Sequence, residues 1–558
     1  MAFVITQPCC NDASCTEVCP VDCIHPTPDE RDFKSTEMLY IDPETCIDCG
    51  LCVDACPVEA IFRDDDLPEA MARYSTINAD YFAGNEPEYA DPAPALKFPK
   101  NAQDPFRVAI VGSGPSAFYA AQELLAFKRS GIEIDMFDRL PTPWGLVRAG
   151  VAPDHLETKS VTDVFSEVAR RAGFRLYLNV EVGTHLSHED LITHHHAVIY
   201  AVGAPSDRHL GIPGEDLPGS LAATEFVAWY NGHPDYADRS FDLTSSRAVI
   251  VGNGNVALDV ARLLVADADR LAKSDMAAHA VEALRESAVD EVVLLGRRGP
   301  AQAAFTSPEL LALGQLPDVD IVVDPAELEL DDASAAEVDA SPAKRLKMTI
   351  LREYAARPLA GHRKRIVLRF LASPVEVVGT DHVTGLVVAR NEMVVDEDGV
   401  MRARTTEQTE LLETGMVLRS VGYRGVPVAG LPFDEARGTI NNVGGRVTEL
   451  DGEPVPGTYT AGWIKRGPSG VIGTNRQCAH DTIALILEDL AADRLDPPKA
   501  DREALAALVA ERQPDVVDWT GWKAIDARER ELGKAAGRPR VKLVDVEEMI
   551  ALSKPKVG

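Results

Sequence analysis

Residues 46–57 read CIDCGLCVDACP, a run that decides what the first part of the chain folds around. Cys46, Cys49 and Cys52 are three positions apart, and Cys56 follows after three further residues and precedes a proline. Three thiolates on one tight loop can cap a face of an iron–sulfur cluster, while a fourth beyond a helical turn points to a different cluster. Zinc sites usually pair two C-x2-C knuckles, so this spacing favours an iron–sulfur module with two clusters.

A less regular run, PCCNDASCTEVCPVDC, occupies residues 8–23 and holds five cysteines in sixteen positions. Cys19 in this run also precedes a proline. We therefore expect Cys19 to complete the cluster that is bound by Cys46, Cys49 and Cys52.

The other cluster is then expected to use Cys56 together with cysteines of the irregular run. A regular motif would place these at positions 9, 12 and 15, but position 12 is Asp12. Cys9, Cys15 and Cys56 thus supply three thiolates, a number that suits a [3Fe–4S] cluster. Cys10 remains an alternative to Cys9 as the ligand, and a second [4Fe–4S] cluster with an unusual fourth ligand also stays open.

The composition excludes several classes of partner. The 558-residue chain carries a formal net charge of −32 at pH 7, whereas nucleic acids and anionic membranes bind to basic patches. No apolar run approaches the length of a membrane-spanning helix, and the first ten residues lack the basic and apolar regions of a signal peptide. We therefore expect no nucleic-acid or membrane partner and a cytoplasmic protein, in which clustered cysteines bind metal more often than they form disulfides.

The sequence pattern changes at residue 107. RVAIVGSGPSAFYAAQELL (107–125) joins an apolar strand, a glycine-rich turn and an alanine-rich helix. Gly112, Gly114 and Ala117 fit the dinucleotide fingerprint, in which the helix N-terminus faces a pyrophosphate. The next strand ends in Asp138, where a carboxylate can bind a ribose hydroxyl. This segment predicts a first dinucleotide site, which we assign to FAD.

A second fingerprint occurs in RAVIVGNGNVALDVARLLV (247–265), with Gly252 and Gly254 in the turn. The following strand ends in Arg297 and Arg298 rather than in an acid. Arginines suit a 2′-phosphate that a carboxylate would repel, so this site is predicted to prefer NADP over NAD. Together the patterns predict an α+β iron–sulfur module followed by an α/β flavoprotein with two Rossmann-like dinucleotide-binding domains.

The first hundred residues resemble a known family, the seven-iron ferredoxins, which carry one [3Fe–4S] and one [4Fe–4S] cluster. The segments EVCPVDCI, MLYIDPETCIDCGLC and CPVEAIF carry the resemblance, as does the tail LPEAMARYSTINADYF. Cys23 matches a cysteine that does not ligate in that family. The loop between Cys9 and Cys15 is two residues shorter than the family's.

Residues from about 105 to 558 resemble the adrenodoxin-reductase type of ferredoxin–NADP reductase. PTPWGLVRAGVAPDH (141–155), GRRGPAQAAFTSPEL (296–310) and GWIKRGPSGVIGTN (462–475) carry this likeness. The order of the parts resembles the actinobacterial ferredoxin/ferredoxin–NADP reductase fusion. The expected domains are a ferredoxin at 1–82, a linker at 83–104, an FAD domain at 105–207 and 426–558, and an NADP domain at 208–425.

The reductase resemblance implies further site residues. Those expected to contact FAD, besides the fingerprint and Asp138, are Leu146, Val182, Trp463, Gly470, Val471 and Ile472. Those expected to contact NADP, besides Gly252 and Gly254, are Arg208, Asn255, Val256, Arg297, Arg298, Glu309 and Gly470.

Three other features of the sequence each have a functional and a structural interpretation. His155 ends the VAPDH segment next to the predicted flavin, but Ala312 stands where the family carries a partner carboxylate, which weakens a proton-relay role. The histidines at 194–196 are predicted to lie in a loop without a metal. Cys478 is expected to be an ordinary helix residue.

The resemblance implies an NADPH:ferredoxin oxidoreductase that passes electrons between NADPH, FAD and two built-in clusters. An external acceptor protein, such as a ferredoxin-dependent oxygenase, would exchange electrons with the clusters. We also expect Lys465 and Arg466 to attract the acidic module, which has twelve acidic and two basic residues in positions 1–62. Two alternatives are an electron-input subunit like the small subunit of glutamate synthase, and a cluster-bearing redox sensor.

Overall fold

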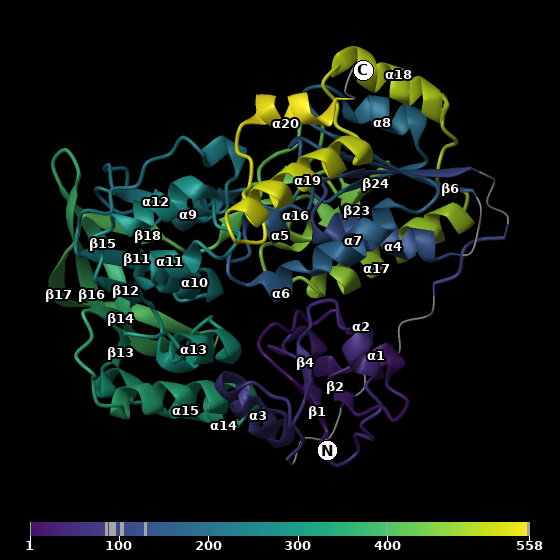
Figure 1. Ribbon diagram of the computed structural model, residues 1–558. Coiled ribbons are helices and arrows are strands. Elements are labelled where there is room, and N and C mark those ends of the chain that lie inside the picture. The colour runs from purple at the N-terminus through teal and green to yellow at the C-terminus, as the bar shows by residue number, and fades with distance from the viewer. Residues whose placement is uncertain are drawn as a thin grey trace.

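The computed structural model describes residues 2–83, 88, 96–100, 105–127, 131–397 and 399–554. Figure 1 shows a small N-terminal module in purple beneath two larger α/β bodies, one mainly teal and green and the other blue and yellow-green. None of the described helices is both long and apolar enough to cross a lipid bilayer.

The N-terminal module is built from two short antiparallel strand pairs and small helices. Strand β1 (Phe3–Ile5) pairs with β4 (Ile61–Arg63), and β2 (Ile24–His25) pairs with β3 (Tyr40–Ile41). Its helices are α1 (Ser14–Val18), η1 (Arg31–Lys34), α2 (Leu51–Ala55), η2 (Glu69–Met71) and α3 (Arg73–Phe82). Buried Ile5, Ile24 and Ile41 lie in one apolar core that also includes Cys15 and Cys52.

The two halves of this module repeat one backbone pattern. Asn11, Ala13 and Asp22 have left-handed φ angles of 58°, 61° and 48°. The residues thirty-seven positions later, Asp48, Gly50 and Glu59, have φ angles of 56°, 78° and 50°. The cysteine loops before α1 and α2 therefore share one conformation, although only the second has the regular spacing.

The first large body is organised around a seven-stranded sheet of order β22-β23-β24-β8-β5-β6-β7. Its five parallel strands are β5 (Phe106–Val111), β6 (Ile132–Asp138), β7 (Phe174–Leu178), β8 (Ala197–Tyr200) and β24 (Pro454–Thr460). Strands β22 (Asn442–Val443) and β23 (Arg446–Thr448) extend it antiparallel, and β20 (Phe433–Asp434) pairs separately with β21 (Thr439–Ile440). The apolar runs of β5 and β8 are buried on both faces, as expected for central parallel strands covered by helices.

The helices of this body come from two distant parts of the chain. The first part contributes α4 (Pro115–Ala126), α5 (Leu146–Ala149), α6 (Leu156–Lys159), α7 (Val161–Ala169) and α8 (His188–His194). The second part contributes α16 (Trp463–Arg466), α17 (Thr474–Ala491), α18 (Arg502–Arg512), α19 (Trp519–Ala535) and α20 (Val546–Ser553). Helix α17 packs along α4, so the two parts share one core.

The second large body holds a parallel sheet of order β10-β18-β11-β12-β14-β13. Its strands are β10 (Ser220–Ala222), β11 (Arg247–Val251), β12 (Glu291–Leu295), β13 (Val319–Val323), β14 (Lys364–Arg369) and β18 (Met416–Arg419). An antiparallel sheet of β15 (Ala372–Gly379), β16 (Val383–Val395) and β17 (Met401–Glu413) lies at its outer side in Figure 1.

Helices cover this second sheet. They are α9 (Ala223–Tyr230), α10 (Asn255–Val265), α11 (Ala268–Leu271), α12 (Ala278–Arg285), α13 (Ser307–Leu313), α14 (Asp332–Asp339) and α15 (Pro342–Ala356). Short 3-10 turns lie at η3 (Pro234–Tyr236), η4 (Pro300–Gln302) and η5 (Pro325–Leu328).

The chain crosses between the two large bodies twice, and the crossing segments pair with each other. Strand β9 (Ser206–Asp207) runs antiparallel to β19 (Tyr423–Arg424). The predicted domain limits at 207 and 425 fall at this two-stranded connection. Most of the predicted linker at 83–104 lies outside the described residues. The predicted fold class, an α+β module followed by two Rossmann-like domains, is confirmed.

The structure corrects the loop prediction for His194, while His195 and His196 lie in the connection before β8 as expected. His194 is the last residue of α8, and its Nδ1 lies 2.7 Å from the Asp190 carbonyl. His196 accepts a hydrogen bond from the Arg107 N–H, and burial lowers its pKa to about 4. These side chains hold the helix end and β5 in place.

A buried charged group fastens the carboxyl-terminal helices to the first sheet. Asp135 in β6 is fully buried and faces Arg502, the first residue of α18, at 3.0 Å. Arg502 also donates to the carbonyls of Ile134 and Gly173, each at 2.8 Å. His195 Nε2 lies 3.1 Å from the same carboxylate. The polar atoms are thus paired inside an apolar core.

We predict that Arg502→Ala lowers the free energy of unfolding by about 3–5 kcal/mol, because it leaves Asp135 buried without its cation. Arg512→Ala is the matched control, since it removes a 2.6 Å ion pair with Asp190 on the exposed side of the same helix. That loss should stay below about 1 kcal/mol. Urea denaturation followed by circular dichroism measures both variants, and equal losses would contradict the prediction.

Candidate functional site

Four of the predicted ligand cysteines gather around the second cysteine loop. Burial raises the pKa of the Cys52 thiol to about 12, and neighbouring thiols add to this rise. Those neighbours are Cys46, Cys49 and Cys19. They are the four residues that the spacing assigns to one cluster, and soft sulfur donors in this number fit an iron–sulfur group.

A second group of thiols lies around the first cysteine loop. Burial raises the pKa of the Cys15 thiol, and the nearby Cys9, Asp12 and Cys56 raise it further. Burial also raises the pKa of Cys9 to about 12, with a contribution from Cys56. Tyr119 Oη, a buried hydroxyl near Cys10 and Asp12, has no hydrogen-bond partner among the described residues. The three neighbouring thiols of Cys9, Cys15 and Cys56 fit an iron–sulfur group.

The backbone repeat distinguishes Cys9 from Cys10. Cys9 occupies the position of Cys46 in the other half, whereas Cys10 corresponds to Ile47. Cys15 has Cys9 among its main electrostatic neighbours, and Cys10 instead packs into the core of the first large body. This geometry favours Cys9 as the ligand.

Asp12 occupies the position that corresponds to Cys49. Its carboxylate accepts hydrogen bonds from the Ser14 hydroxyl at 2.6 Å and the Ser14 N–H at 3.2 Å. Burial raises the pKa of the Asp12 carboxyl, while Ser14 and the nearby Arg476 lower it. The side chain is thus engaged by hydrogen bonds within its own loop, although it lies close to the thiols.

The carboxyl ends of the parallel strands in the first sheet bring the predicted flavin residues to one edge. Gly112 follows β5 with φ of 105°, and a Cβ there would lie 2.4 Å from the Ala201 carbonyl oxygen. Gly114 caps α4, and Gly145 approaches its Cα so closely that a Cβ would lie 2.9 Å away. Only glycine permits this turn, which leaves backbone N–H groups of α4 free to face a pyrophosphate.

Asp138, at the end of β6, is already bound to this turn. Its carboxylate accepts from the Ser113 hydroxyl at 2.6 Å and from the Ser113 and Leu140 N–H groups at 2.9 and 3.0 Å. Burial raises the pKa of this carboxyl, and these hydrogen bonds oppose the rise. Ala117 is buried in α4, Leu146 begins α5, and Val182 packs near Tyr200 beyond the strand ends.

The remaining predicted flavin residues lie where the two large bodies meet. The Trp463 ring lies 5.2 Å from that of Tyr423 in the connecting strand β19, and its Nε1 donates to the Ser469 carbonyl. Gly470 has a φ of 80°, and the Val471 N–H donates to Thr474. Ile472 packs on the same apolar core as Cys10, so this turn lies against the small module.

The predicted NADP residues gather at the carboxyl edge of the second sheet. Gly252 has a φ of 128°, and a Cβ there would meet the Ser420 carbonyl at 2.1 Å. Gly254, which caps α10, has open space in front of it. Asn255 and Val256 begin α10, and the Asn255 amide oxygen accepts from the Thr306 N–H at 2.8 Å.

The arginines beside this turn are available for a ligand. Arg297 and Arg298 follow β12, and both are exposed. Neither guanidinium makes an ion pair within the described part of the chain. Arg208, just after β9, is also exposed. Free guanidinium groups next to an open helix N-terminus are what a phosphorylated ribose would bind.

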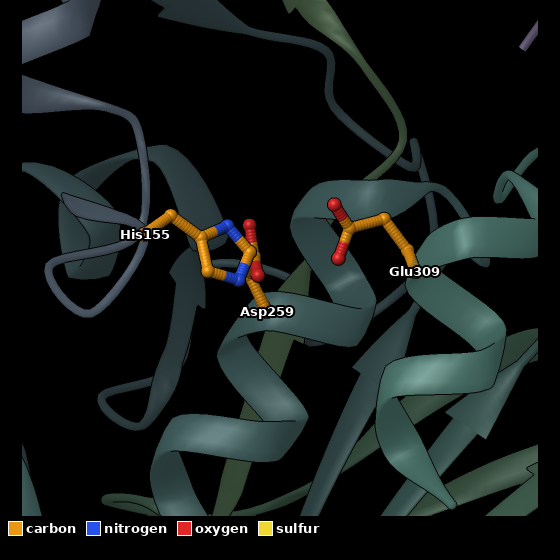
Figure 2. A group of neighbouring side chains, drawn as sticks. All are labelled: His155, Asp259 and Glu309. Atoms are coloured by element: carbon orange, nitrogen blue, oxygen red, sulfur yellow. The ribbon is translucent and has the colours of Figure 1, made fainter. Parts of the chain in front are cut away.

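His155, Asp259 and Glu309 converge between the two bodies, as Figure 2 shows. Their ligand atoms lie within 4.8 Å of one another, which raises the question of a metal ion. Arg262, however, donates to Asp259 at 2.9 Å and approaches His155 Nε2 at 3.1 Å. A guanidinium already supplies the cation here, so the arrangement disfavours a metal.

The same contacts define the state of His155. A guanidinium has no acceptor atom, so His155 Nε2 must accept from Arg262, and the ring proton lies on Nδ1. Burial raises the pKa of the Glu309 carboxyl, and the neighbouring Asp259 raises it further. Sequence reasoning identified His155 and Glu309 but missed Asp259 and Arg262, whose partners come from distant segments.

The small module is seated on the first large body by the loop of residues 10–12. The Gly473 N–H donates to the Cys10 carbonyl at 2.7 Å, and a Cβ at Gly473 would lie 2.2 Å from the backbone of this loop. Arg476 donates to the Asp12 carbonyl at 2.9 Å and pairs with Glu17 at 2.7 Å. The Ser160 hydroxyl lies 2.8 Å from the Pro57 carbonyl.

The small module also contacts the second large body. Glu37 accepts from the Ser307 N–H at 2.7 Å and pairs with Lys347 at 3.3 Å. Gln7 donates to Glu309 at 3.3 Å, so one residue of the module reaches the converging group of Figure 2. Farther out, Arg73 pairs with Glu353 through two short bonds.

The expected attraction by Lys465 and Arg466 is not what the structure shows. Lys465 Nζ lies 3.1 Å from Thr482, and Arg466 donates to Ser469 and Asn475, all within the first large body. The cations that meet the module are instead Arg476, in the first turn of α17, and Lys347 in α15. No local pattern in the sequence distinguishes this arginine from its neighbours.

Comparison with known proteins agrees with this geometry. A profile described as a 4Fe-4S binding domain matches residues 39–62, and one described as a pyridine nucleotide-disulphide oxidoreductase matches residues 106–296. The chain is 47% identical over 561 residues to the probable ferredoxin/ferredoxin–NADP reductase of Mycobacterium leprae, covering 99% of this chain and 98% of the relative.

The reductase part has solved relatives. The NADPH-ferredoxin reductase FprA of Mycobacterium tuberculosis is 50% identical over 459 residues, which are 80% of this chain and 99% of FprA. The structure of that FprA in complex with NADPH superposes with a TM-score of 0.76 at 49% identity, covering 80% of this chain and 99% of that chain.

A full-length relative at this identity carries the same two parts in one chain. The separate reductase matches 80% of this chain, and the iron–sulfur profile matches within the small module. The chain therefore belongs to the ferredoxin/ferredoxin–NADP reductase family and is an oxidoreductase with an iron–sulfur-binding domain joined to a pyridine-nucleotide-dependent reductase.

Proposed function

We propose that this chain catalyses electron transfer between NADPH and an external protein through FAD and two iron–sulfur clusters of its own. The observation that supports the proposal is the position of the first thiol group, at the contact between the small module and the first large body. Cys9 and Cys56 pack against both the module's core and the core of the first large body. Bound FAD would take a hydride from NADPH and release its two electrons singly to iron–sulfur centres.

The chain's own residues would position these groups. The glycine turns at 112–114 and 252–254 would hold the two pyrophosphates, and Asp138 would orient a ribose from its fixed place on Ser113. Trp463 at the junction of the large bodies would pack against the flavin ring system. Val471, Ile472 and the loop of residues 10–12 would exclude water between flavin and module.

We assign the first cluster site to Cys9, Cys15 and Cys56, as a [3Fe–4S] site, and the second to Cys19, Cys46, Cys49 and Cys52. The engagement of Asp12 with Ser14 supports three rather than four ligands at the first site. His155 is assigned a structural role beside the flavin, since its Nε2 is occupied by Arg262.

The alternative of an input subunit for a larger enzyme is less well supported. Relatives named as ferredoxin/ferredoxin–NADP reductases match 99% of this chain and 95–98% of their own length. The acceptor would be an electron-transfer protein outside the chain, such as a ferredoxin-dependent oxygenase.

Iron analysis and electron paramagnetic resonance test the cluster assignment. We expect about seven iron atoms per FAD and an oxidised-state [3Fe–4S] signal, as three plus four ligands imply. Cys9→Ser should abolish that signal, whereas Cys10→Ser should retain it. Eight irons without an oxidised-state signal, or loss of the signal in Cys10→Ser alone, would overturn the assignment.

The arginine pair is tested by cofactor selectivity. Arg297→Ala and Arg298→Ala should each raise the KM for NADPH about 10- to 150-fold, because a charged hydrogen bond to the 2′-phosphate contributes about 1.5–3 kcal/mol. The KM for NADH should stay unchanged. Arg437→Ala, at an exposed arginine elsewhere, is the control. An equal rise in the KM for NADH would show that the two arginines do not bind the 2′-phosphate.

The seat of the module is tested by charge reversal at Arg476. Arg476→Glu would face Glu17 with a like charge and should slow electron transfer from flavin to clusters by about tenfold at low ionic strength. Stopped-flow reduction by NADPH measures this step, and ferricyanide reduction reports the flavin alone. An unchanged rate in Arg476→Glu, with Arg437→Glu as control, would contradict the observed seat.

A further inference from the structure

Large apolar side chains are exposed beside the second thiol group. Ile47 is 58% exposed and Leu51 is 48% exposed, and they flank Cys49, which is itself exposed. Val18, Val21 and Val53 are each 37% exposed. We call this surface, made of Val18, Val21, Ile47, Cys49, Leu51 and Val53, the open face. Apolar side chains that are exposed together, with a polar rim, mark interaction sites more often than single exposed ones do.

The internal repeat relates the open face to the surface that is already docked. On the docked side, Cys10 and Val58 are 4% and 1% exposed, because they pack into the core of the first large body. Thirty-seven residues away in the repeat, their counterparts are Ile47 and Val21. The module therefore has two surfaces that the internal repeat relates to each other. The reductase covers one of them, and the other is uncovered within the described structure.

The charges of the two faces correspond as well. Glu17 on the docked side pairs with Arg476 at 2.7 Å, and its counterpart in the repeat is Asp54. Asp54 is exposed, and so are Asp22 and Glu44 near the same cysteines. A partner that covers the open face would need what the reductase offers to the docked side: an apolar centre and a cation at its rim.

The two thiol groups differ in where they lie. Cys9 and Cys56 pack against the flavin-side core, whereas Cys19 and Cys46 pack only against the module's own core. Cys49 adjoins solvent. Because electron transfer slows steeply with distance, the first group is placed to exchange electrons with the flavin and the second with a protein outside.

We propose, on the basis of the function proposed above, that the open face docks a one-electron-transfer protein with an apolar centre and a basic rim. The cluster of Cys19, Cys46, Cys49 and Cys52 would be the point of exit. Each NADPH oxidised to NADP+ and H+ then reduces two such partners by one electron each. With a ferric haem protein, two Fe3+ become two Fe2+.

Cytochrome c, a small basic haem protein, is the probe, and its Kd for the holoenzyme is measured by isothermal titration calorimetry at low ionic strength. Ile47→Ser/Leu51→Ser should weaken binding about tenfold, since the centre of an interface carries most of its affinity. Asp54→Asn should weaken it about threefold, with a smaller effect at high salt. Leu450→Ser/Asp451→Asn, on an exposed hairpin elsewhere, should leave the Kd unchanged.

Iron content and paramagnetic resonance check that each variant keeps both clusters, and Asp54→Asn remains informative if the apolar double variant does not assemble. A wild-type Kd in both open-face variants would overturn the proposal. The proposal would also be overturned if light scattering found a dimer that Ile47→Ser/Leu51→Ser converts to a monomer. A second copy of the chain would then cover the open face.

A further variant separates this proposal from the function on which it rests. Cys49→Ser should abolish NADPH-driven reduction of cytochrome c while ferricyanide reduction continues. If cytochrome c reduction survives in Cys49→Ser, electrons do not leave through the clusters and the proposed function fails. If it is abolished but the open-face variants keep the wild-type Kd, only the docking site is wrong.

Discussion

The missing side chain at Gly473 lets the loop of residues 10–12 lie directly on the turn that begins α17. Its N–H donates to the Cys10 carbonyl at 2.7 Å, and a Cβ would fall 2.2 Å from the loop backbone. At this close approach Cys9 and Cys56 pack against both apolar cores, and Cys10 lies in the core of the first large body. The position of the first thiol group, and hence any short path from a flavin to a cluster, depends on it.

The docked module also contacts the second large body. Gln7 reaches Glu309, and Glu37 meets the start of α13, so the module touches both dinucleotide-binding bodies where they meet each other. A strongly acidic module is held there by a few well-placed cations, Arg476 and Lys347, rather than by a broad basic surface. The Arg476–Glu17 pair is partly exposed and contributes little affinity, whereas the Lys347–Glu37 pair is largely buried. We infer that the apolar contact supplies most of the stability and that the cations fix the orientation.

An internal repeat explains how one small module can serve two partners. Its two halves hold their cysteines on loops with matching left-handed backbone angles, and sequence differences then give the halves separate tasks. The first half has Asp12 at the position that corresponds to Cys49, and its surface lies against the reductase. The second half kept the regular spacing and presents Ile47 and Leu51 to solvent.

The sequence alone determined the fold class, the two thiol groups and the two dinucleotide turns, because each rests on short-range spacing of residues with special chemistry. The tight turns at Gly112 and Gly252 could be predicted in this way, and the binding of a 2′-phosphate by Arg297 and Arg298 stays a prediction. Tertiary structure alone decided what depends on segments far apart in the chain. It placed Arg476, not Lys465 or Arg466, against the module, put Arg262 between His155 and Asp259, and buried Cys10 while leaving its counterpart Ile47 exposed. The spacing of residues along the chain does not determine which face of the repeated module another domain covers. The covered face depends on shape and charge contributed by residues hundreds of positions apart.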